Sequence, residues 1–290
     1  MALTRAQLAQ FEEDGFLIVE GLIDPEDAAR AASRCEKVFT GEYDTGVVPD
    51  GMNFGEGQAA APHNRQIDNC WRCDYTLGSL VLRQEIGECL AQLAGFSGAR
   101  LLQDILVWKV PGSLSVRMHQ DTDYTDFITP RELFSCAIAL TDTDPSVGTI
   151  EYVRGSHRWG LTQTGDDSFY GKLDYRGVML EAAAERGVSP EIVPIQAPMG
   201  AAVFHHALTW HGSGPNIDPS RDRKNLVVQC AATETRFDGD SSENFIGQQF
   251  RRYKHFDSDE MDENFFPILW SESGYRTPWL DEYASRGQAH

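Results

Sequence analysis

Two histidines and an aspartate in this chain have the types and the spacing needed to hold a metal ion. His119 and Asp121 are separated by one residue, and His211 follows much later, just before a Gly-Ser-Gly-Pro-Asn run. Two imidazoles and one carboxylate are the ligands that hold non-haem Fe(II) on one face and leave the opposite face open for a co-substrate and dioxygen. This pattern therefore predicts a redox enzyme.

A second His-x-Asp pair, His255 and Asp257, is a weaker candidate. It lies in a run, 253–260, that is rich in charge and shows no alternation of polar and apolar residues, which is typical of a solvated helix or loop. Only His290, at the end of the chain, follows it as a further histidine. We therefore expect this pair to be exposed and not to bind metal.

The elements around the first pair are predicted to be strands. Residues 101–110 are rich in Leu, Ile and Val and end at Pro111-Gly112, which indicates a buried strand closed by a turn. The next strand is expected to begin at 114–119. Because alternate side chains of a strand share a face, His119 and Asp121 should point the same way.

The third metal ligand has three candidates. Residues 201–204 are predicted to form a strand, and His205, His206 and His211 follow it. His211 is preferred because it stands at the mouth of the turn, where a strand end opens to a pocket. The other two lie in the middle of the run and are expected to pack as neutral rings or to support the ligands.

An arginine beyond this block could bind one end of a dicarboxylate whose other end chelates the metal. Arg221 and Arg223 both precede an apolar run, 225–230, that is predicted to be a strand. Arg223 is preferred because it belongs to the alternating set of that strand, whereas Arg221 is expected to lie in the preceding turn. The alternative is that both are surface charges.

Together these residues resemble the phytanoyl-CoA hydroxylase-like (phytanoyl-CoA dioxygenase) family, Fe(II)/2-oxoglutarate-dependent oxygenases that include ectoine hydroxylase. The resemblance covers most of the chain and rests on the opening at 4–23, the run His119-Gln120-Asp121 with Tyr124, the signature at 148–157 and the block at 200–216. The chain departs from the family at Arg154, where the signature usually has proline. The turn before Arg223 is also one residue longer than usual, which keeps Arg221 as an alternative.

The resemblance implies cofactors and the roles of several residues. His119, Asp121 and His211 would bind Fe(II), and Arg223 would bind the distal carboxylate of 2-oxoglutarate, with O2 as the second co-substrate. Gln103 matches a glutamine that contacts the co-substrate in ectoine hydroxylase-like members.

The implied reaction is oxidation of a C–H bond of a small metabolite, most simply a hydroxylation, with release of succinate and CO2. Family halogenases have Gly or Ala in place of Asp121. Its presence therefore favours hydroxylation or another oxidative outcome over halogenation.

The pattern of the whole chain predicts a mainly β fold with flanking helices. Strands and turns alternate without a linker from 101 to 235, which fits a double-stranded β-helix, a jelly roll of the cupin-like kind. We expect a single domain over 1–290. It would have a helical N-terminal part and lid at 1–100, the jelly-roll core at 101–235 and a C-terminal flap with helices at 236–290.

Composition limits the partners and the location. The 290 residues include 44 acidic and 25 basic side chains, and the formal net charge of −19 opposes binding to nucleic acid or to an anionic membrane. No apolar run is long enough to cross a membrane, and the N-terminus lacks a secretion signal pattern. We therefore expect a cytoplasmic protein with a small-molecule partner, while the oligomeric state is not predicted.

The six cysteines are expected to be free thiols, because a chain of this length does not need disulfides to be stable. Cys70 and Cys73 form a C-x-x-C pair with no second pair or suitably spaced histidine. We expect neither structural zinc nor redox chemistry there.

Two segments could shape a substrate pocket: loop-like residues 41–75 and the aromatic-rich residues 237–283. Tyr124, close after the ligand pair, and Arg72, within 41–75, are the predicted substrate contacts. A small polar compound or a product of secondary metabolism is the expected substrate. Two other functions stay open at this point: a zinc hydrolase with the same three ligands, and a cupin-type barrel that binds a small molecule without chemistry.

Overall fold

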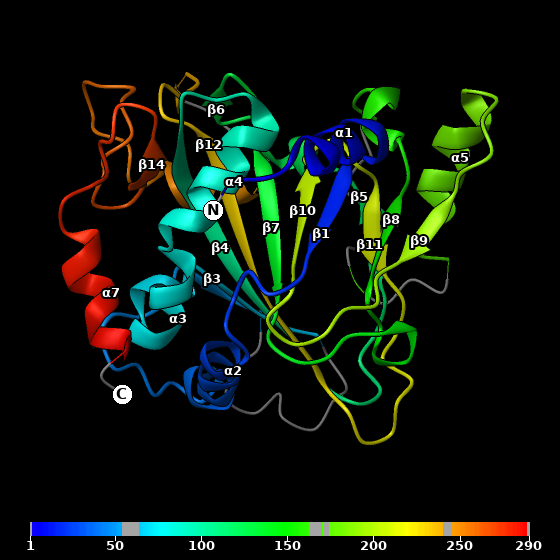
Figure 1. The fold of residues 1–290 in the computed structure, drawn as a ribbon, viewed down its shortest axis with the longest axis horizontal. Coiled ribbons are helices and arrows are strands. Elements are labelled where there is room, and N and C mark those ends of the chain that lie inside the picture. Colours follow the sequence, from blue (N-terminus) through cyan, green and yellow to red (C-terminus); the bar gives the residue numbers. More distant parts are fainter. Residues whose placement is uncertain (1, 54–63, 163–169, 171–173, 240–244, 289–290) are drawn as a thin grey trace.

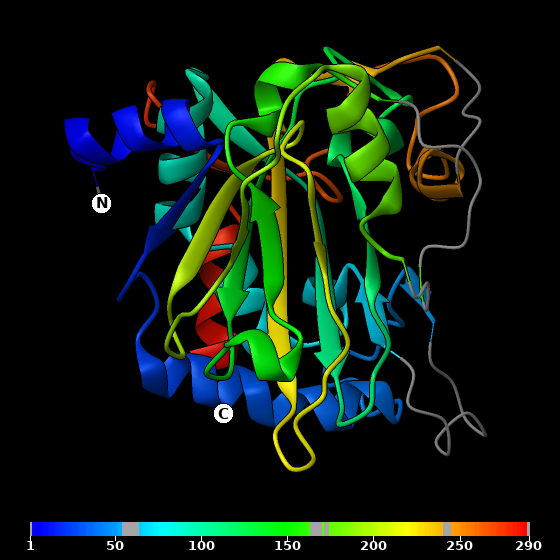
Figure 2. The same ribbon diagram turned by 90° about the vertical axis from the view of Figure 1, so that its right-hand side faces the viewer.

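The computed structural model describes residues 2–53, 64–162, 170, 174–239 and 245–288. Two antiparallel sheets face each other at its centre (Figures 1 and 2), which confirms the predicted double-stranded β-helix. The larger sheet has the strand order β1-β10-β7-β12-β4-β3-β2, with β14 paired to β4, and the smaller sheet has the order β5-β11-β8-β9.

The strands of the larger sheet are β1 (Phe16–Val19), β2 (Gly51–Met52), β3 (Arg65–Asp68), β4 (Gly98–Lys109), β7 (Phe134–Ala139), β10 (Ala202–His206), β12 (Arg223–Ala232) and β14 (Ile268–Ser271). Those of the smaller sheet are β5 (Val116–His119), β8 (Ile150–Val153), β9 (Ile192–Pro194) and β11 (His211–Ser213). A separate pair is formed by β6 (Ile128–Thr129) and β13 (Arg236–Phe237).

Helices cover the face of the larger sheet that points away from the smaller one (Figure 1). They are α1 (Arg5–Asp14), α2 (Pro25–Phe39), α3 (Tyr75–Val81), α4 (Gln84–Ala94) and α7 (Leu280–Gln288). Two of them begin where the sequence supplies capping residues. The side chain of Thr4 accepts from the backbone of Gln7 in a capping box, and Asp24 caps α2 immediately before Pro25.

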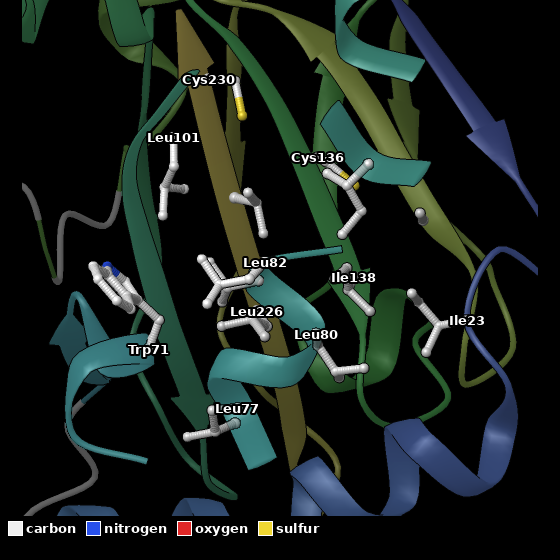
Figure 3. Close-up of a cluster of buried hydrophobic side chains, with 14 of the residues drawn as sticks. Ile23, Trp71, Leu77, Leu80, Leu82, Leu101, Cys136, Ile138, Leu226 and Cys230 are labelled. Atoms are coloured by element: carbon white, nitrogen blue, oxygen red, sulfur yellow. The ribbon is translucent and has the colours of Figure 1, made fainter. Parts of the chain in front are cut away.

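The main hydrophobic core lies between these helices and the larger sheet (Figure 3). Alternation along β12 sends Leu226, Val228 and Cys230 into this core, so that the residues between them face the smaller sheet. Burying one such aliphatic side chain stabilises a fold by about 1.5–3 kcal/mol. The same alternation fixes which polar residues of β12 point towards the space between the sheets.

A second layer of packing supports the smaller sheet from its outer side. Met118 of β5 and Trp210, which precedes β11, pack with Met179 of α5 (Gly177–Glu185) in a fully buried cluster. Met118 therefore points outwards, and its neighbours Arg117 and His119 point to the inside of the barrel.

Residues 41–75, expected to be loop-like, contribute two strands. Strands β2 and β3 pair with each other, and β3 pairs with β4, so this segment extends the larger sheet. The strand was missed because β3 is short and only Ile67 is apolar and buried in the core. Strand β1, near the N-terminus, joins the larger sheet as well. Residues 54–63 of the expected lid lie outside the described residues.

The cysteines follow the prediction: all six are buried and free. Burial raises the pKa of Cys35 to about 12, so this thiol stays protonated at neutral pH. Within the described part of the chain, no helix combines the length and the apolar character that crossing a membrane requires.

Candidate metal centre

The three predicted ligands meet between the sheets. His119 is the last residue of β5, and His211 is the first residue of the neighbouring strand β11. Asp121 lies two residues after His119, with Gln120 between them. One ligand atom from each residue lies within 4.8 Å of the other two. Oδ1 of Asp121 is 3.6 Å from Nε2 of His119 and 3.5 Å from Nε2 of His211.

Asp121 reaches this position by a route that differs from the prediction. Strand β5 stops at His119, and Asp121 is the first residue of a 3-10 helix, η2 (Asp121–Tyr124). The intervening Gln120 is fully buried and its amide donates to the backbone carbonyls of Gly160 and Leu208, at 3.0 and 2.7 Å. These bonds draw the chain out of the sheet, so strand alternation does not extend to Asp121.

Both histidines present a lone pair to the common centre. Nδ1 of His119 lies 2.9 Å from the carbonyl oxygen of Arg117, and Nδ1 of His211 lies 2.9 Å from that of Thr209. A carbonyl oxygen can only accept, so each Nδ1 carries the proton. In the neutral ring Nε2 is then unprotonated and free to bind a metal.

The carboxylate of Asp121 is held by its other oxygen. Oδ2 accepts hydrogen bonds from Ser135 of β7 at 2.8 Å and from Gln229 of β12 at 2.9 Å. Nε2 of His205 lies 3.1 Å from the same oxygen, while Nδ1 of His205 lies 3.0 Å from the hydroxyl of Tyr152. With Oδ2 fully engaged, Oδ1 is the atom left to point at the two histidines.

His205 therefore supports Asp121 and is not one of the three gathered ligands, in agreement with the preference for His211. His206 lies on the opposite face of β10, where it packs against Phe134 and accepts from the backbone N–H of Leu208. The exposed pair His255 and Asp257 lies outside the barrel, as expected.

The electrostatics favour the protonation states that a metal needs. Burial alone would raise the pKa of Asp121, but its contacts with His211, His119 and His205 outweigh burial and hold that pKa well below its usual value. Burial, together with the neighbouring His119, lowers the pKa of His211 well below its usual value. A carboxylate beside a neutral imidazole is the ligand form, so the donor set fits a divalent cation such as Fe(II).

Two cations are buried deeper between the sheets. Arg223 at the start of β12 and Lys109 at the end of β4 are cross-strand neighbours with 3% and 0% of their surface exposed. Nζ of Lys109 donates to Oγ of Ser213 at 2.7 Å and to the carbonyl of Gly214 at 2.6 Å. Ser213 is two residues from His211 in β11, or about 7 Å along the strand, so the cation pair lies near the ligands.

Arg223 is a buried cation that pairs with no carboxylate among the described residues. Among the described residues its guanidinium donates to the carbonyl of Gly148, and its Nε is buried there without a partner. Burial lowers the pKa of Arg223 to about 10 and, with the charge of Arg223, lowers the pKa of Lys109 well below its usual value. A buried pair of basic side chains of this kind suits an anionic ligand.

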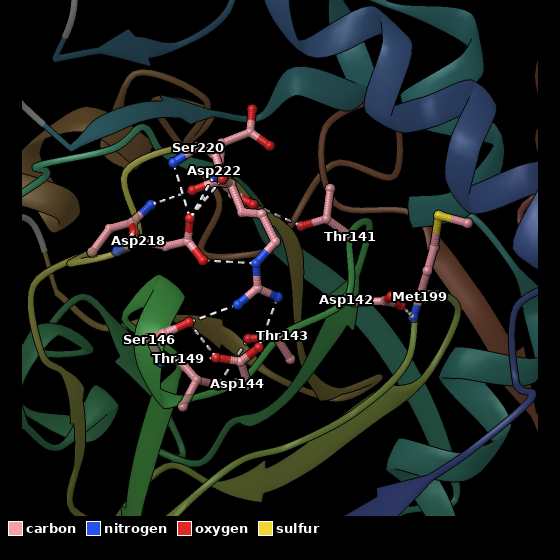
Figure 4. Close-up of polar contacts among 12 residues, drawn as sticks. Thr141, Asp142, Thr143, Asp144, Ser146, Thr149, Met199, Asp218, Ser220 and Asp222 are labelled. Atoms are coloured by element: carbon pink, nitrogen blue, oxygen red, sulfur yellow. Dashed lines mark hydrogen bonds and ion pairs between the residues drawn. The ribbon is translucent and has the colours of Figure 1, made fainter.

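Arg221 is committed elsewhere. Its guanidinium pairs with Asp144 and Asp218, each at 2.8 Å, and donates to Ser146 at 2.6 Å. Figure 4 shows these partners, Asp144, Ser146 and Asp218, within a network of polar contacts. Nearly half of the Arg221 side chain is exposed, so the structure separates the two rival arginines clearly.

The remaining predicted site residues fall in two places. Gln103 of β4 donates to Gln229, which contacts Asp121, so it belongs to the same polar network. The Tyr124 ring meets that of His119 edge-on, with centroids 6.0 Å apart. Arg72 lies apart from these residues, in η1 (Cys70–Arg72), and pairs with Asp50.

Sequence reasoning missed several residues of this site. Lys109 alternates with Gln103 along β4, and that period of two was the available signal for a polar face. Ser135 and Tyr152 carried no signal of their own, because their roles depend on contacts between segments distant in sequence.

Comparison with known proteins supports this reading of the site. The family described as phytanoyl-CoA dioxygenase (PhyH) matches residues 11–224. The ectoine dioxygenase of Bordetella bronchiseptica is 27% identical over 234 residues, which are 75% of this chain and 72% of that protein. The peroxisomal phytanoyl-CoA dioxygenase of Mus musculus is 27% identical over 230 residues, which are 74% of this chain and 64% of that protein.

Solved structures show the same fold. The non-heme alpha ketoglutarate dependent carbocyclase SnoK from nogalamycin biosynthesis is similar with a TM-score of 0.69 and 21% identity, covering 92% of this chain and 97% of that one. EctD from S. alaskensis, solved with 2-oxoglutarate and 5-hydroxyectoine, has a TM-score of 0.64 and 17% identity, covering 81% and 78%. The family match spans all three gathered residues as well as Arg223, and the chain belongs to the phytanoyl-CoA dioxygenase family.

Proposed function

We propose that this protein is an Fe(II)- and 2-oxoglutarate-dependent oxygenase that hydroxylates or otherwise oxidises a C–H bond of a small molecule. His119, Asp121 and His211 would hold the metal. The observation that carries the proposal is the convergence of two unprotonated Nε2 atoms and one free carboxylate oxygen within 4.8 Å, next to a buried cation pair. Both features are needed by an oxygenase that uses a dicarboxylate.

Arg223 and Lys109 would bind the distal carboxylate of 2-oxoglutarate. A guanidinium that is buried and lacks a carboxylate partner among the described residues gains a charge-assisted, bidentate contact when the co-substrate enters. Lys109, already oriented by Ser213, adds a second positive charge. Gln103 would contact the co-substrate from β4, next to Gln229 and Asp121.

When bound, Fe(II) and 2-oxoglutarate together supply the oxidising chemistry, converting 2-oxoglutarate and O2 to succinate and CO2 as one oxygen atom enters the product. The protein positions the reacting groups and excludes water. Tyr124, whose ring meets His119 edge-on, would contact the substrate next to the metal. The carboxylate of Asp121, held by Ser135, Gln229 and His205, fills the third ligand position.

The two alternative functions leave the buried cations without a role. A zinc hydrolase with these ligands needs a general base near the metal-bound water and no carboxylate-binding arginine. A cupin-type binding protein has no need for ligand atoms in their unprotonated form.

Metal replacement tests the proposal. The protein is loaded anaerobically with Fe(II) or with Zn(II), 2-oxoglutarate is added, and succinate is measured after exposure to air. We expect succinate to form with the Fe(II) protein and not with the Zn(II) protein. When a panel of metabolites is screened, the substrate should increase the rate of succinate formation further. Hydrolytic activity with Zn(II), and no succinate with Fe(II), would favour the hydrolase.

A further inference from the structure

A pocket of about 520 Å³ is lined by residues other than those of the metal centre. Its walls come from three segments that are distant in sequence: the residues before β2, the end of η1, and the chain that follows α6 (Phe245–Arg251). Asp50, Arg72, Arg252, Tyr253, Lys254 and Phe265 are the lining residues that matter to its chemistry. None of them belongs to the metal centre.

The pocket is basic in a strongly acidic protein. Arg72, Arg252 and Lys254 line it with a single carboxylate, Asp50, which leaves a surplus of two positive charges where the whole chain carries −19. Lys254 also pairs with Asp259 at the surface, at 3.0 Å. The two arginines are therefore the cations on which the local potential depends.

Asp50 orients both arginines but accepts only some of their N–H donors. Its Oδ1 accepts from Nη1 of Arg72 at 2.6 Å and pairs with Nη2 of Arg252 at 2.7 Å, while its Oδ2 accepts from the amide of Asn69 at 2.7 Å. The hydroxyl of Tyr253 bonds Oδ1 as well, at 2.5 Å. The side chain of Asp50 is only 3% exposed, so its carboxylate is a buried partner from which the guanidiniums extend into the pocket.

Each guanidinium keeps donors for a ligand. The Nε and Nη2 groups of Arg72 have no acceptor among the described residues, and neither do the Nε and Nη1 groups of Arg252. Nε and Nη2 form one edge of a guanidinium, the edge that binds a carboxylate or phosphate with two parallel hydrogen bonds. Arg72 therefore offers a complete bidentate edge.

Aromatic rings hold these guanidiniums in place. Tyr253 and Phe265 stack with centroids 4.2 Å apart, and the guanidinium carbon of Arg72 lies 5.1 and 5.2 Å from the two centroids. That of Arg252 lies 4.9 Å from the Tyr253 centroid. Cation–π contacts of this kind reduce the freedom that an arginine loses when it binds an anion.

We propose that this pocket is a binding site for an oxyanion, a phosphate or carboxylate group carried by a small organic molecule. The organic part would lie against the Tyr253–Phe265 stack while Arg72 and Arg252 bind the oxyanion. The site does not depend on the metal centre or on the proposed oxygenase activity. It gives Arg72 a role as an anion contact at a place separate from the ligand triad.

Binding of phenyl phosphate, benzoate and inorganic phosphate to the full-length protein tests this assignment. Binding is followed by calorimetry and by ligand-detected NMR at low ionic strength, with 2-oxoglutarate present to fill the Arg223 pocket. We expect saturable binding, tighter for phenyl phosphate than for inorganic phosphate because of the aromatic stack. The comparison of phenyl phosphate with benzoate identifies which oxyanion the site prefers.

Matched variants locate the binding. Arg72→Gln is expected to weaken phenyl phosphate at least about tenfold, since it removes a charge-assisted bidentate contact. Arg236→Gln removes the same charge from an exposed residue outside the pocket and is expected to leave binding unchanged. Arg72→Lys keeps the charge and its pairing with Asp50 but loses the fork, so an intermediate affinity is expected if the variant melts like the parent.

Three results would overturn the proposal. One is no saturable binding of any of the three probes below about 10 mM. Another is an equal loss in Arg72→Gln and Arg236→Gln, which would reduce the effect to overall charge. The third is binding that survives Arg72→Gln and disappears in Arg223→Gln, which would place the anion at the co-substrate pocket instead.

Discussion

Replacing Arg223 by methionine is expected to have opposite effects on the empty protein and on its complex with 2-oxoglutarate. Without co-substrate, Arg223 is a buried cation with no carboxylate partner among the described residues, and burial already lowers its pKa to about 10. Methionine fills similar space without a charge to desolvate, so the unfolding free energy should stay the same or rise. With co-substrate, the variant lacks the group that receives the distal carboxylate.

The magnitude follows from the burial of the pair. Truncating one partner of a buried, hydrogen-bonded charge pair costs about 2–5 kcal/mol of binding, or roughly thirtyfold to several thousandfold in affinity. In the parent, 2-oxoglutarate at 100 times its Kd should stabilise the folded Fe(II)-loaded protein by about 2.7 kcal/mol. In Arg223→Met the same concentration is at most about three times the weakened Kd, so the stabilisation should fall below about 1 kcal/mol.

Thermal melting of the anaerobic Fe(II) protein, with and without 2-oxoglutarate, measures both effects, and the KM for 2-oxoglutarate measures the affinity loss independently. Arg221→Gln is the matched control, because its ion pairs with Asp144 and Asp218 are exposed and screened by solvent. The reasoning would be refuted if 2-oxoglutarate raised the melting temperature of Arg223→Met as much as that of the parent, or if Arg221→Gln raised the KM instead.

Three further predictions concern one residue beside the site and three buried residues elsewhere in the fold. His205→Ala should lower Fe(II) affinity about 10- to 100-fold, because it removes the contact that supports Oδ2 of Asp121. His206→Ala, on the other face of β10, should leave the affinity unchanged. Equal Fe(II) affinities of the two variants in anaerobic metal titrations would contradict this role of His205. Burial raises the pKa of Asp104 to about 7, above its unfolded value, so its stabilising contribution is present below about pH 4 and lost as the pH rises through 7. Asp104→Asn should therefore gain up to about 4 kcal/mol relative to the parent between pH 4 and 8 in urea unfolding, and parallel pH profiles would contradict the assignment. Burial raises the pKa of Cys35 to about 12 and that of Cys89 to about 11. Both thiols should therefore resist alkylation by iodoacetamide at pH 7.5 in the folded protein. Rapid alkylation detected by mass spectrometry would contradict this prediction.

The sequence was sufficient for the parts of the site that lie on regular strands. The alternation of β12 correctly placed Arg223 on the inner face and Arg221 in the turn, because strand geometry leaves only two directions for a side chain. It was insufficient for Asp121, since the buried bonds of Gln120 turn the chain out of β5 through contacts with Gly160 and Leu208. Such contacts join segments that no local pattern connects.

The same limit applies to the support of the metal ligands and to the outer pocket. His205 was expected to pack as a neutral ring or to support the ligands, and the sequence could not decide between the two because its bond to Asp121 depends on the register of β10 in the larger sheet. Arg72 was selected for its place in an expected lid, yet its partners Asp50 and Tyr253 come from either side of it in sequence. A single domain over 1–290 and a cytoplasmic location stay predictions.

The central claim is that His119, Asp121 and His211 hold one Fe(II) that 2-oxoglutarate can chelate. Its most direct test is the visible absorption of the anaerobic protein titrated with Fe(II) in the presence of 2-oxoglutarate. We predict a metal-to-ligand charge-transfer band that saturates at one Fe(II) per chain and is absent from His211→Ala. No band in the parent, or an unchanged band in His211→Ala, would contradict the account.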